Sequence, residues 1–492
     1  MLRTCKNTLS VLLLLSMLTA LSCGEGVTED TITDAAAGTT TAAPETAEYT
    51  VPDVNYNGAE FVILDQDSTS NTNWICLKYH TISAEEETGE PINDAQYQSL
   101  RKTEEELNVK INCFMPGSRL QTVRNSVMAQ DDEYDLVTTT AAGTLASEPG
   151  LVVDLAVIDT LNLAASWWQQ NAVEAFTLNG KLKVLIGDIT PYTYFSPIIF
   201  FFNKQVVDEF KLENPYELVR SGDWTLAKAY EMSRDVASDM NGDSVMDEND
   251  RFGTAVNYAL VSEFLAAAGQ KYVKQNKDGG LDFVLNSERT ASVVSDAVKF
   301  LNDASVNNIA QKFQSGYKNV FAHLHVPMFK DNRLLFNFNQ LLVTFELRSM
   351  EADFGVLPMP KYDEAQTEYY TPLNTSWAEF IGIPSTNREL DMAGHVLNSL
   401  GYYGQQYIKP AFIDTTVKGK SLRDEDSVEM LEIIMDSIVY DLGIFYDFGS
   451  VKSGVDALGV NNTPDGFASM YASAESAVKE AIKSTLELLN EE

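Results

Sequence analysis

The 492-residue sequence is poor in the patterns that carry enzyme chemistry. Its 4 histidines, His80, His323, His325 and His395, show no spacing typical of a catalytic metal centre. A GxSxG nucleophile motif, a CxxC pair and a GxGxxG fingerprint are also missing. These absences favour a protein that is not an enzyme. A carboxylate pair for glycoside hydrolysis stays open as an alternative, because such pairs have no fixed spacing in sequence.

Basic residues are scarce as well. The chain has 35 Lys and Arg residues against 71 Asp and Glu residues, which gives a formal net charge of −36 at pH 7. The acidic surplus is spread along the chain and argues against binding to nucleic acid or to anionic membrane surfaces. We therefore expect no nucleic-acid partner, and the charge favours an uncharged or a cationic small ligand.

Long apolar runs are missing except at the N-terminus. Arg3 and Lys6 precede the run Leu9–Leu21, which small residues and Cys23 follow. A basic start, a short apolar run and small residues at its end are typical of a secretory signal, and the run is too short to span about 30 Å of hydrocarbon. Cys23 resembles the acylated cysteine of a bacterial lipobox, although Ala20 stands where Leu is commonest. An ordinary signal peptide with an incidental cysteine is the alternative.

The segment after the signal has a composition unlike that of a folded domain. If residues 1–22 are the signal peptide, the mature chain begins at Cys23, with palmitate or another acyl chain on its thiol. Residues 23–51 are mainly Thr, Ala, Glu and Asp, which cannot bury enough surface to offset their ordering entropy. We expect this segment to be a disordered tether that holds a folded body at the extracellular face of the cell membrane.

Few cysteines remain for the folded body. The sequence has 4, and Cys5 and Cys23 belong to the signal and its end. Cys76 and Cys113 are left, and the sequence is compatible both with a disulfide in an oxidising exterior and with two free thiols.

From residue 52 on, predicted strands alternate with predicted helices. Strands are expected at 61–64, 109–114 and 134–137, and helices at 94–107 and 120–128. This alternation predicts an α/β fold with mostly parallel sheets, and the length predicts two lobes. Ligands of such sheets bind beyond the carboxyl ends of the strands. The side chains at those positions are Asp65, Gln66, Asp67, Thr139 and Thr140.

Aromatic residues near predicted strand and loop ends are the best candidates for a sugar site. A sugar has apolar C–H faces and a polar rim, so its sites combine flat aromatic walls with polar side chains. Each ring can equally fill the core. Trp74, Tyr194 and Trp377 lie in polar surroundings and are the strongest candidates, and Tyr192 is a further one.

An acidic loop at 239–250 has the spacing of an EF-hand-type calcium site. Gly242 stands at loop position 4 instead of 6, and the last ligand is Asp instead of Glu. An acidic turn without metal is the alternative. We predict a structural Ca²⁺ ion with the ligands Asp239, Asn241, Asp243, the Val245 carbonyl, Asp247 and Asp250.

Three motifs, in this order, make the sequence similar to a known family. Ile198–Lys204 resembles its apolar hinge strand, Ser221–Thr225 its Trp-Thr helix start, and Asp353–Tyr362 its "fGvlPmPk" strand. Together with the lipobox, they identify the chain as resembling a family 1 extracellular solute-binding lipoprotein of a carbohydrate ABC transporter. The chain departs from the commonest pattern at Thr139, where an aromatic residue often stands.

The resemblance implies a two-lobed, periplasmic-binding-protein-like (type II) fold with a hinge between the lobes. It implies that the chain captures a carbohydrate, an oligosaccharide by preference, by hinge closure and delivers it to the permease subunits of an ABC transporter, as a monomer. Asn337 and Asn339 are added to the ligand-binding candidates on this basis. The expected order is N-lobe first part 52–155, C-lobe 156–325, N-lobe second part 326–375, and C-lobe completion 376–492.

Three other functions stay open. A surface-anchored glycan hydrolase would need a carboxylate pair about 5–10 Å apart beside an aromatic cleft. A solute-binding protein for a non-sugar ligand fits the same fold. A glycan-capture protein of helical repeats is disfavoured by the predicted strands.

Overall fold

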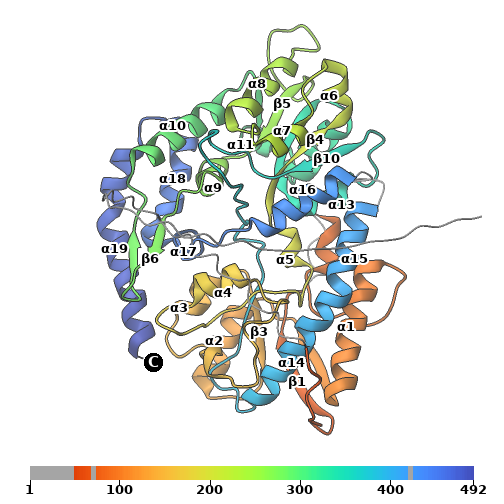
Figure 1. Cartoon of the computed structure of the whole chain (residues 1–492), viewed down its shortest axis with the longest axis vertical. Coiled ribbons are helices and arrows are strands. Elements are labelled where there is room, and N and C mark those ends of the chain that lie inside the picture. The colour runs from red at the N-terminus through yellow and green to blue at the C-terminus, as the bar shows by residue number, and fades with distance from the viewer. Residues whose placement is uncertain (1–48, 68–73, 419–424, 492) are drawn as a thin grey trace, which may run out of the picture. The chain divides into compact units, whose positions relative to one another are not determined.

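The computed structural model describes residues 49–67, 74–418 and 425–491. The predicted signal peptide, Cys23 and most of the predicted tether lie outside the described residues. Two mixed sheets, each covered by helices, organise the described chain (Figure 1). No helix in these three ranges combines the length and the apolar character needed to cross a bilayer.

The first lobe is built on a four-stranded sheet with the order β11-β3-β1-β2. β1 pairs in parallel with β2 and β3, and β11 closes the sheet as an antiparallel edge strand. The strands are β1 (Ala59–Leu64), β2 (Val109–Phe114), β3 (Leu136–Thr139) and β11 (Phe380–Gly382). Its helices are α1 (Pro91–Leu107), α2 (Arg119–Ala129), α3 (Ala142–Ser147), α4 (Gln170–Phe176), α5 (Tyr192–Phe195), α14 (Leu390–Tyr403) and α15 (Lys409–Ile413).

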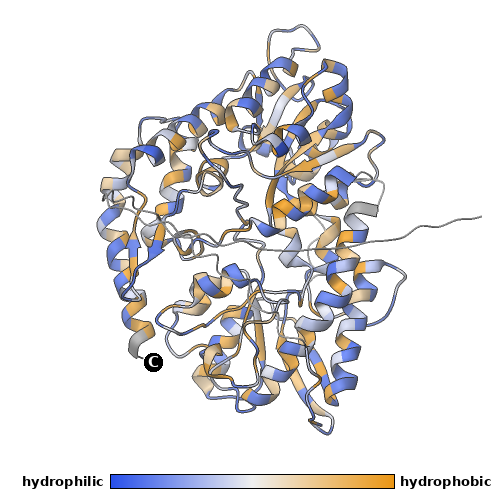
Figure 2. Cartoon of the chain, viewed as in Figure 1, coloured by the Kyte–Doolittle hydropathy of each residue, from blue (hydrophilic) through white to orange (hydrophobic). Residues whose placement is uncertain are grey.

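The second lobe is built on a five-stranded sheet with the order β10-β4-β9-β5-β8. β5 is parallel to β8 and β9, whereas β4 runs antiparallel to both β9 and β10. The strands are β4 (Ile198–Asn203), β5 (Phe252–Val256), β8 (Asn307–Ile309), β9 (Leu334–Gln340) and β10 (Phe354–Leu357), and β6 (Val273–Gln275) and β7 (Leu281–Phe283) form a separate hairpin. Apolar residues dominate β4 and β9, as Figure 2 shows. The reason is that helices cover both faces of this sheet, so both sets of side chains are buried.

Helices of the second lobe come from two separate parts of the chain. The first part supplies α6 (Lys204–Phe210), α7 (Pro215–Ser221), α8 (Leu226–Val236), α9 (Leu260–Ala267), α10 (Glu288–Asn302), α11 (Ala310–Phe313), α12 (Val326–Lys330) and α13 (Thr344–Leu347). The C-terminal part supplies α16 (Glu425–Asp436), α17 (Leu442–Phe445), α18 (Val451–Val460) and α19 (Phe467–Glu491). α16 contacts β10, and α18 packs on α9 and α10.

Helix starts follow the local sequence. Glu90 accepts hydrogen bonds from the backbone N–H groups of Ile92 and Asn93, and Pro91 needs no such partner, so α1 begins three residues before the predicted start. Thr225 caps α8 through the N–H of Lys228, as the sequence predicts.

Two crossing segments, at residues 196–198 and 372–374, lie side by side between the lobes. The backbone N–H of Ile198 donates to the carbonyl of Pro372 at 2.9 Å, and that of Asn374 donates to the carbonyl of Ser196 at 3.0 Å. Pro197 and Leu373 form the bridge between these two bonds. The chain crosses once more between α15, which contacts α1, and α16, which contacts β10.

The predicted assignment of segments to lobes is wrong in three places. Residues 326–357 carry β9 and β10, which pair with β4, so they belong to the second lobe. β11 then returns residues 376–413 to the first lobe, because it pairs with β3 and α14 packs on α1. Residues 156–195 also stay in the first lobe, where Leu185 bridges Ile381. Fully apolar strands fit either sheet equally well, so their pattern did not distinguish the two.

Cys76 and Cys113 are both free thiols. Cys76 is fully buried, and burial raises the pKa of both thiols well above the ordinary value. The structure therefore favours the second of the two readings that the sequence left open.

Candidate functional site

A cavity of about 430 Å³, called the groove below, lies at the carboxyl ends of the second-lobe strands. Asn257 follows β5, Gln311 follows β8, and Asn339 and Gln340 end β9. The first lobe contributes Trp74, and the returning crossing segment contributes Asn374 and Trp377. The other lining residues are Ile198, Ala259, Glu263, Gln314, Tyr317, Lys318, Asn319, Val320, Phe321 and Phe338.

The walls of the groove combine aromatic rings with uncharged amides. Trp74 is 8% exposed, and Trp377 is half-buried. The amides come from Asn257, Gln311, Gln314, Asn319, Asn339, Gln340 and Asn374. Rings offer flat apolar faces, and each amide offers two N–H donors and one carbonyl acceptor. This chemistry suits a neutral ligand that has apolar faces and many hydroxyl groups.

Trp377 is the outermost ring of a buried stack. Tyr192, fully buried, lies 6.2 Å from Trp377 between ring centroids, at an interplanar angle of 19°. His80 stacks on Tyr192 with centroids 3.6 Å apart. His80 also lies 6.5 Å from Trp377 between ring centroids, so Trp377 packs against both buried rings, and Tyr192 is not among the described residues that line the groove.

A buried ion-pair cluster fixes this stack. His80 Nε2 donates to Glu379 Oε2 at 2.6 Å, and Arg119 donates to Glu379 Oε1. Arg119 also donates to Gln66 Oε1 at 2.9 Å and to the Thr138 hydroxyl. Burial alone would raise the pKa of Glu379, but the hydrogen bond from His80 and the positive charge of Arg119 lower it below its usual value. Glu379 thus stays ionised and holds the ring on which Trp377 depends.

The first-lobe candidates at the strand ends make hydrogen bonds to this cluster or to neighbouring loops. Asp65, 2% exposed, accepts hydrogen bonds from Thr81 Oγ1 at 2.6 Å and from the Ile82 N–H at 2.7 Å. Burial raises the pKa of its carboxyl. Thr139 accepts from the N–H of Ala141. Of the described residues that line the groove, none is among Asp65, Gln66, Asp67, Thr139 and Thr140.

The remaining candidates differ in position. Asn339 lines the groove, and its side-chain N–H₂ group is buried without a hydrogen-bond partner. Asn337, two residues earlier on the same strand face, is fully buried, and neither its amide nitrogen nor its amide oxygen has a partner. The hydroxyl of Tyr194 donates to Asp188 at 2.6 Å, and its ring stacks on Phe412, which places it in the core. Trp74, Asn339 and Trp377 are thus the predicted residues that the structure brings together.

The sequence interpretation missed most of the second-lobe lining. Asn257 directly follows β5 and Gln311 comes two residues after the end of β8, so the rule that pointed to Asp65 would have found them if applied to the second sheet. Tyr317, Asn319 and Phe321 lie in an irregular stretch between α11 and α12, where periodicity gives no signal.

The acidic loop at 239–250 is closed by its own backbone. Asp239 accepts hydrogen bonds from the N–H groups of Gly242 at 2.6 Å and Ser244 at 2.7 Å. Ser244, at loop position 6, has a φ of 68°, which is the sharp turn that EF-hand loops make with Gly. Within the described ranges, no group of three or more His, Cys, Asp or Glu side chains gathers closely enough to hold a metal ion. The backbone turn at Ser244 therefore fits a calcium loop, but the carboxylates of the loop do not converge on one point. The calcium site stays a prediction.

Solved structures share this fold at low sequence identity. A cyclic α-maltosyl-1,6-maltose binding protein from Arthrobacter globiformis matches with a TM-score of 0.57 and 12% identity, over 87% of this chain and 99% of its own. An ABC substrate-binding protein from Listeria monocytogenes in complex with cycloalternan matches with a TM-score of 0.51 and 14% identity, over 88% and 99%. A sugar transporter protein from Rhizobium etli in an open conformation matches with a TM-score of 0.54 and 13% identity, over 88% of this chain and 99% of its own.

Neither a protein-family model nor a curated protein matches the sequence. The structural likeness establishes the expected fold class: an α/β, two-lobed, periplasmic-binding-protein-like fold with a hinge between its lobes.

Proposed function

We propose that this protein binds a neutral oligosaccharide in the groove and delivers it to an ABC permease outside the cytoplasm. The observation that carries the proposal is the composition of the groove: Trp74 and Trp377 provide rings, and seven Asn and Gln side chains provide hydrogen-bonding groups. The proteins that share the fold include binders of maltosyl-maltose and cycloalternan, which supports a sugar over a non-sugar ligand.

The position of the crossing segments supports hinge closure as the proposed mechanism. Trp74 belongs to the first lobe and Asn339 to the second, and Trp377 follows the hinge residue Asn374 by three positions. A ligand that touches both walls has more contacts in the closed form than in the open form, so it shifts the population toward closure. The permease would then recognise the closed form.

The groove offers little to a hydrolase. Among the described residues that line it, Glu263 is the single carboxylic acid. Glycoside hydrolysis in most families needs two carboxyl groups that flank the scissile bond. Binding without turnover is therefore the function that these side chains support.

The cellular location of the protein is proposed from the N-terminal sequence. A signal at residues 1–22, an acylated Cys23 and a tether at 23–51 would hold the binding body at the extracellular face of the cell membrane, next to its permease. The body is proposed to act as a monomer and to have no nucleic-acid partner, in line with the charge of −36.

Calcium is proposed as a structural ligand of the 239–250 loop. The spacing of its oxygen-bearing residues and the left-handed turn at Ser244 support this proposal. A carboxylate that accepts two N–H bonds keeps further lone pairs for a cation. The ion would tie the end of α8 to the start of β5, the strand that Asn257 of the groove follows.

A thermal-shift screen tests the sugar proposal directly. The mature protein is heated with maltotetraose, raffinose, cellotetraose and xylotetraose, each with product analysis by chromatography. A sugar at about 100 times its dissociation constant adds about 2.7 kcal/mol of stability, which is easily detected. The proposal is refuted if none of the four raises the melting temperature, and cleavage of any of them would revive the hydrolase.

A further inference from the structure

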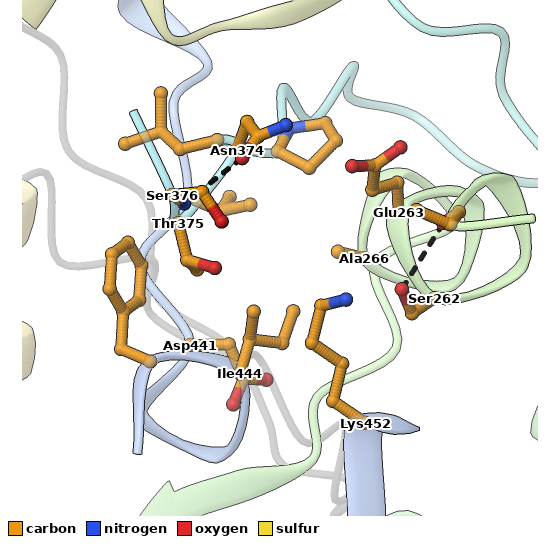
Figure 3. A pocket seen from close by; sticks show the side chains of 14 residues that line it. Ser262, Glu263, Ala266, Asn374, Thr375, Ser376, Asp441, Ile444 and Lys452 are labelled. Atoms are coloured by element: carbon orange, nitrogen blue, oxygen red, sulfur yellow. Dashed lines mark hydrogen bonds between the residues drawn. The ribbon is translucent and has the colours of Figure 1, made fainter. Parts of the chain in front are cut away.

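A second cavity, of about 150 Å³, adjoins the groove and is called the chamber below (Figure 3). It shares Ala259, Glu263 and Asn374 with the groove lining, so the two spaces meet at these residues. α9 contributes one wall, the returning crossing segment a second, and α17 with the start of α18 a third. An engineered cavity of about 150 Å³ holds a benzene molecule, so the chamber has room for roughly one small ring or a branched polar arm.

The side chain of Glu263 lines the chamber (Figure 3), and it has unused hydrogen-bonding capacity. Its side chain is buried, and its Oε2 atom has no hydrogen-bond partner. Burial raises the pKa of Glu263 to about 8, although the charge of Lys452 opposes the shift. At neutral pH the carboxyl is therefore mostly uncharged, with one O–H donor and free acceptor capacity. Buried polar groups in native proteins usually have partners, so Oε2 has hydrogen-bonding capacity that a molecule in the chamber could use.

The other charged groups around Glu263 are already matched. Lys452 Nζ donates to Asp456 Oδ2 at 2.8 Å. Asp441, from the loop before α17, accepts from the N–H groups of Tyr272 at 2.7 Å and Gly443 at 2.8 Å. Apart from Glu263, Lys452 and Asp441 are the charged groups among the described residues that line the chamber, so with Glu263 uncharged the lining has no surplus of positive charge to hold a ligand carboxylate. The chamber suits an uncharged group that carries hydroxyls.

We infer that the chamber is a terminal subsite of the groove, which takes the neutral, hydroxyl-bearing end of the bound oligosaccharide with Glu263 as its hydrogen-bonding partner. The inference rests on the proposed sugar-binding function and adds where the ligand ends and what chemistry that end has. The Glu263 O–H donates to a ligand hydroxyl oxygen, and no covalent bond changes. Asn374, at the junction, lies beside the sugar as it passes from the groove into the chamber.

The test uses two substitutions at one position. Glu263→Gln keeps the shape and both kinds of hydrogen-bonding group, whereas Glu263→Leu keeps the volume and removes them. The probe is whichever of the four screened sugars raises the melting temperature of the wild type most, and its affinity is measured by calorimetry. At pH 7 we expect Glu263→Leu to weaken binding at least tenfold and Glu263→Gln to stay within about threefold of the wild type.

The pH dependence separates binding from folding. If the ligand needs protonated Glu263, wild-type affinity falls about tenfold from pH 7 to pH 9, and Glu263→Gln removes this fall. The melting temperature without sugar is the second readout. If Glu263 has only a structural role, Glu263→Leu lowers the melting temperature and leaves the sugar affinity equal to that of the wild type. Equal affinity of the two proteins, whatever their melting temperatures, overturns the inference. If the wild type binds none of the sugars, the proposed function itself fails, and the subsite fails with it.

Discussion

Glu379 is the side chain whose replacement tests most directly how the groove wall is held. It is 4% exposed and binds His80 and Arg119, the first of which stacks under Tyr192 and Trp377. Glu379→Gln keeps the shape and removes the negative charge. Arg119 is then left buried beside a neutral amide, which costs about 3–5 kcal/mol where a buried pair loses one partner.

The assay is urea unfolding of the wild type, Glu379→Gln, Arg119→Gln and the double variant. We expect each single variant to lose about 3–5 kcal/mol of unfolding free energy, and the double variant to lose much less than their sum, because the second change removes the orphaned partner. The tryptophan fluorescence of the folded protein should change in parallel, and the same substitutions made in a Trp377→Phe background should lose this change. Additive losses, or a loss below about 1 kcal/mol for Glu379→Gln, would refute the idea that this cluster holds the wall.

The same cluster predicts a pH window. The pKa of Glu379 is lower in the folded protein than its ordinary value near 4.5, so the carboxylate contributes stability that is present in full above that value. This contribution is lost as the pH falls below it, through the lower folded pKa. The stability of Glu379→Gln should therefore depend less on pH between about 5 and 3 than that of the wild type. Parallel curves for the two proteins would count against the assignment.

Three further predictions concern the ligand, the metal and the anchor. Trp377→Ala should weaken sugar binding by about 2 kcal/mol, roughly 30-fold by calorimetry, whereas Tyr194→Phe, outside the groove, should leave the affinity unchanged. A chelator should lower the melting temperature of the wild type, and Asp239→Ala should abolish that effect; a melting temperature that ignores the chelator contradicts a calcium site. Cys23→Ser should release the full-length protein from membranes in fractionated cells, and an unchanged membrane fraction would contradict the lipid anchor.

Local sequence predicted the elements well because each element is fixed by local chemistry. The strands predicted at 61–64 and 109–114 are β1 and β2, the motif Asp353–Tyr362 contains β10, and the helices predicted at 94–107 and 120–128 are α1 and α2 with ends shifted by a few residues. The path between lobes was not predictable in this way. Whether Leu334–Gln340 joins one sheet or the other depends on its partner β4, which lies more than a hundred residues earlier.

The candidate site, too, could be predicted from the sequence only in part. Aromatic chemistry predicts Trp74 and Trp377, and the family resemblance predicts Asn339. All three line the groove, and their contact with a ligand stays a prediction. Asp65 satisfies the strand-end rule equally well, yet it faces the loop that carries Thr81 and is used there. A carboxylate after a strand can serve a ligand or a neighbouring loop, and only the tertiary contacts decide. The chamber around Glu263 was beyond sequence reasoning, since it joins residues from α9, the crossing segment and α18.

One short segment connects ligand contact, hinge and wall support. Pro372 and Asn374 hold the paired crossing strands, Trp377 faces the groove, and Glu379 holds the cluster of the first lobe. Rotation of the lobes about Asn374 must therefore move Trp377 relative to Asn339, while Glu379 keeps the ring fixed to the first lobe. In the proposed function, a ligand held between the two walls opposes reopening of the closed form. If the proposed function holds, binding and closure are coupled by chain connectivity over the eight residues from Pro372 to Glu379.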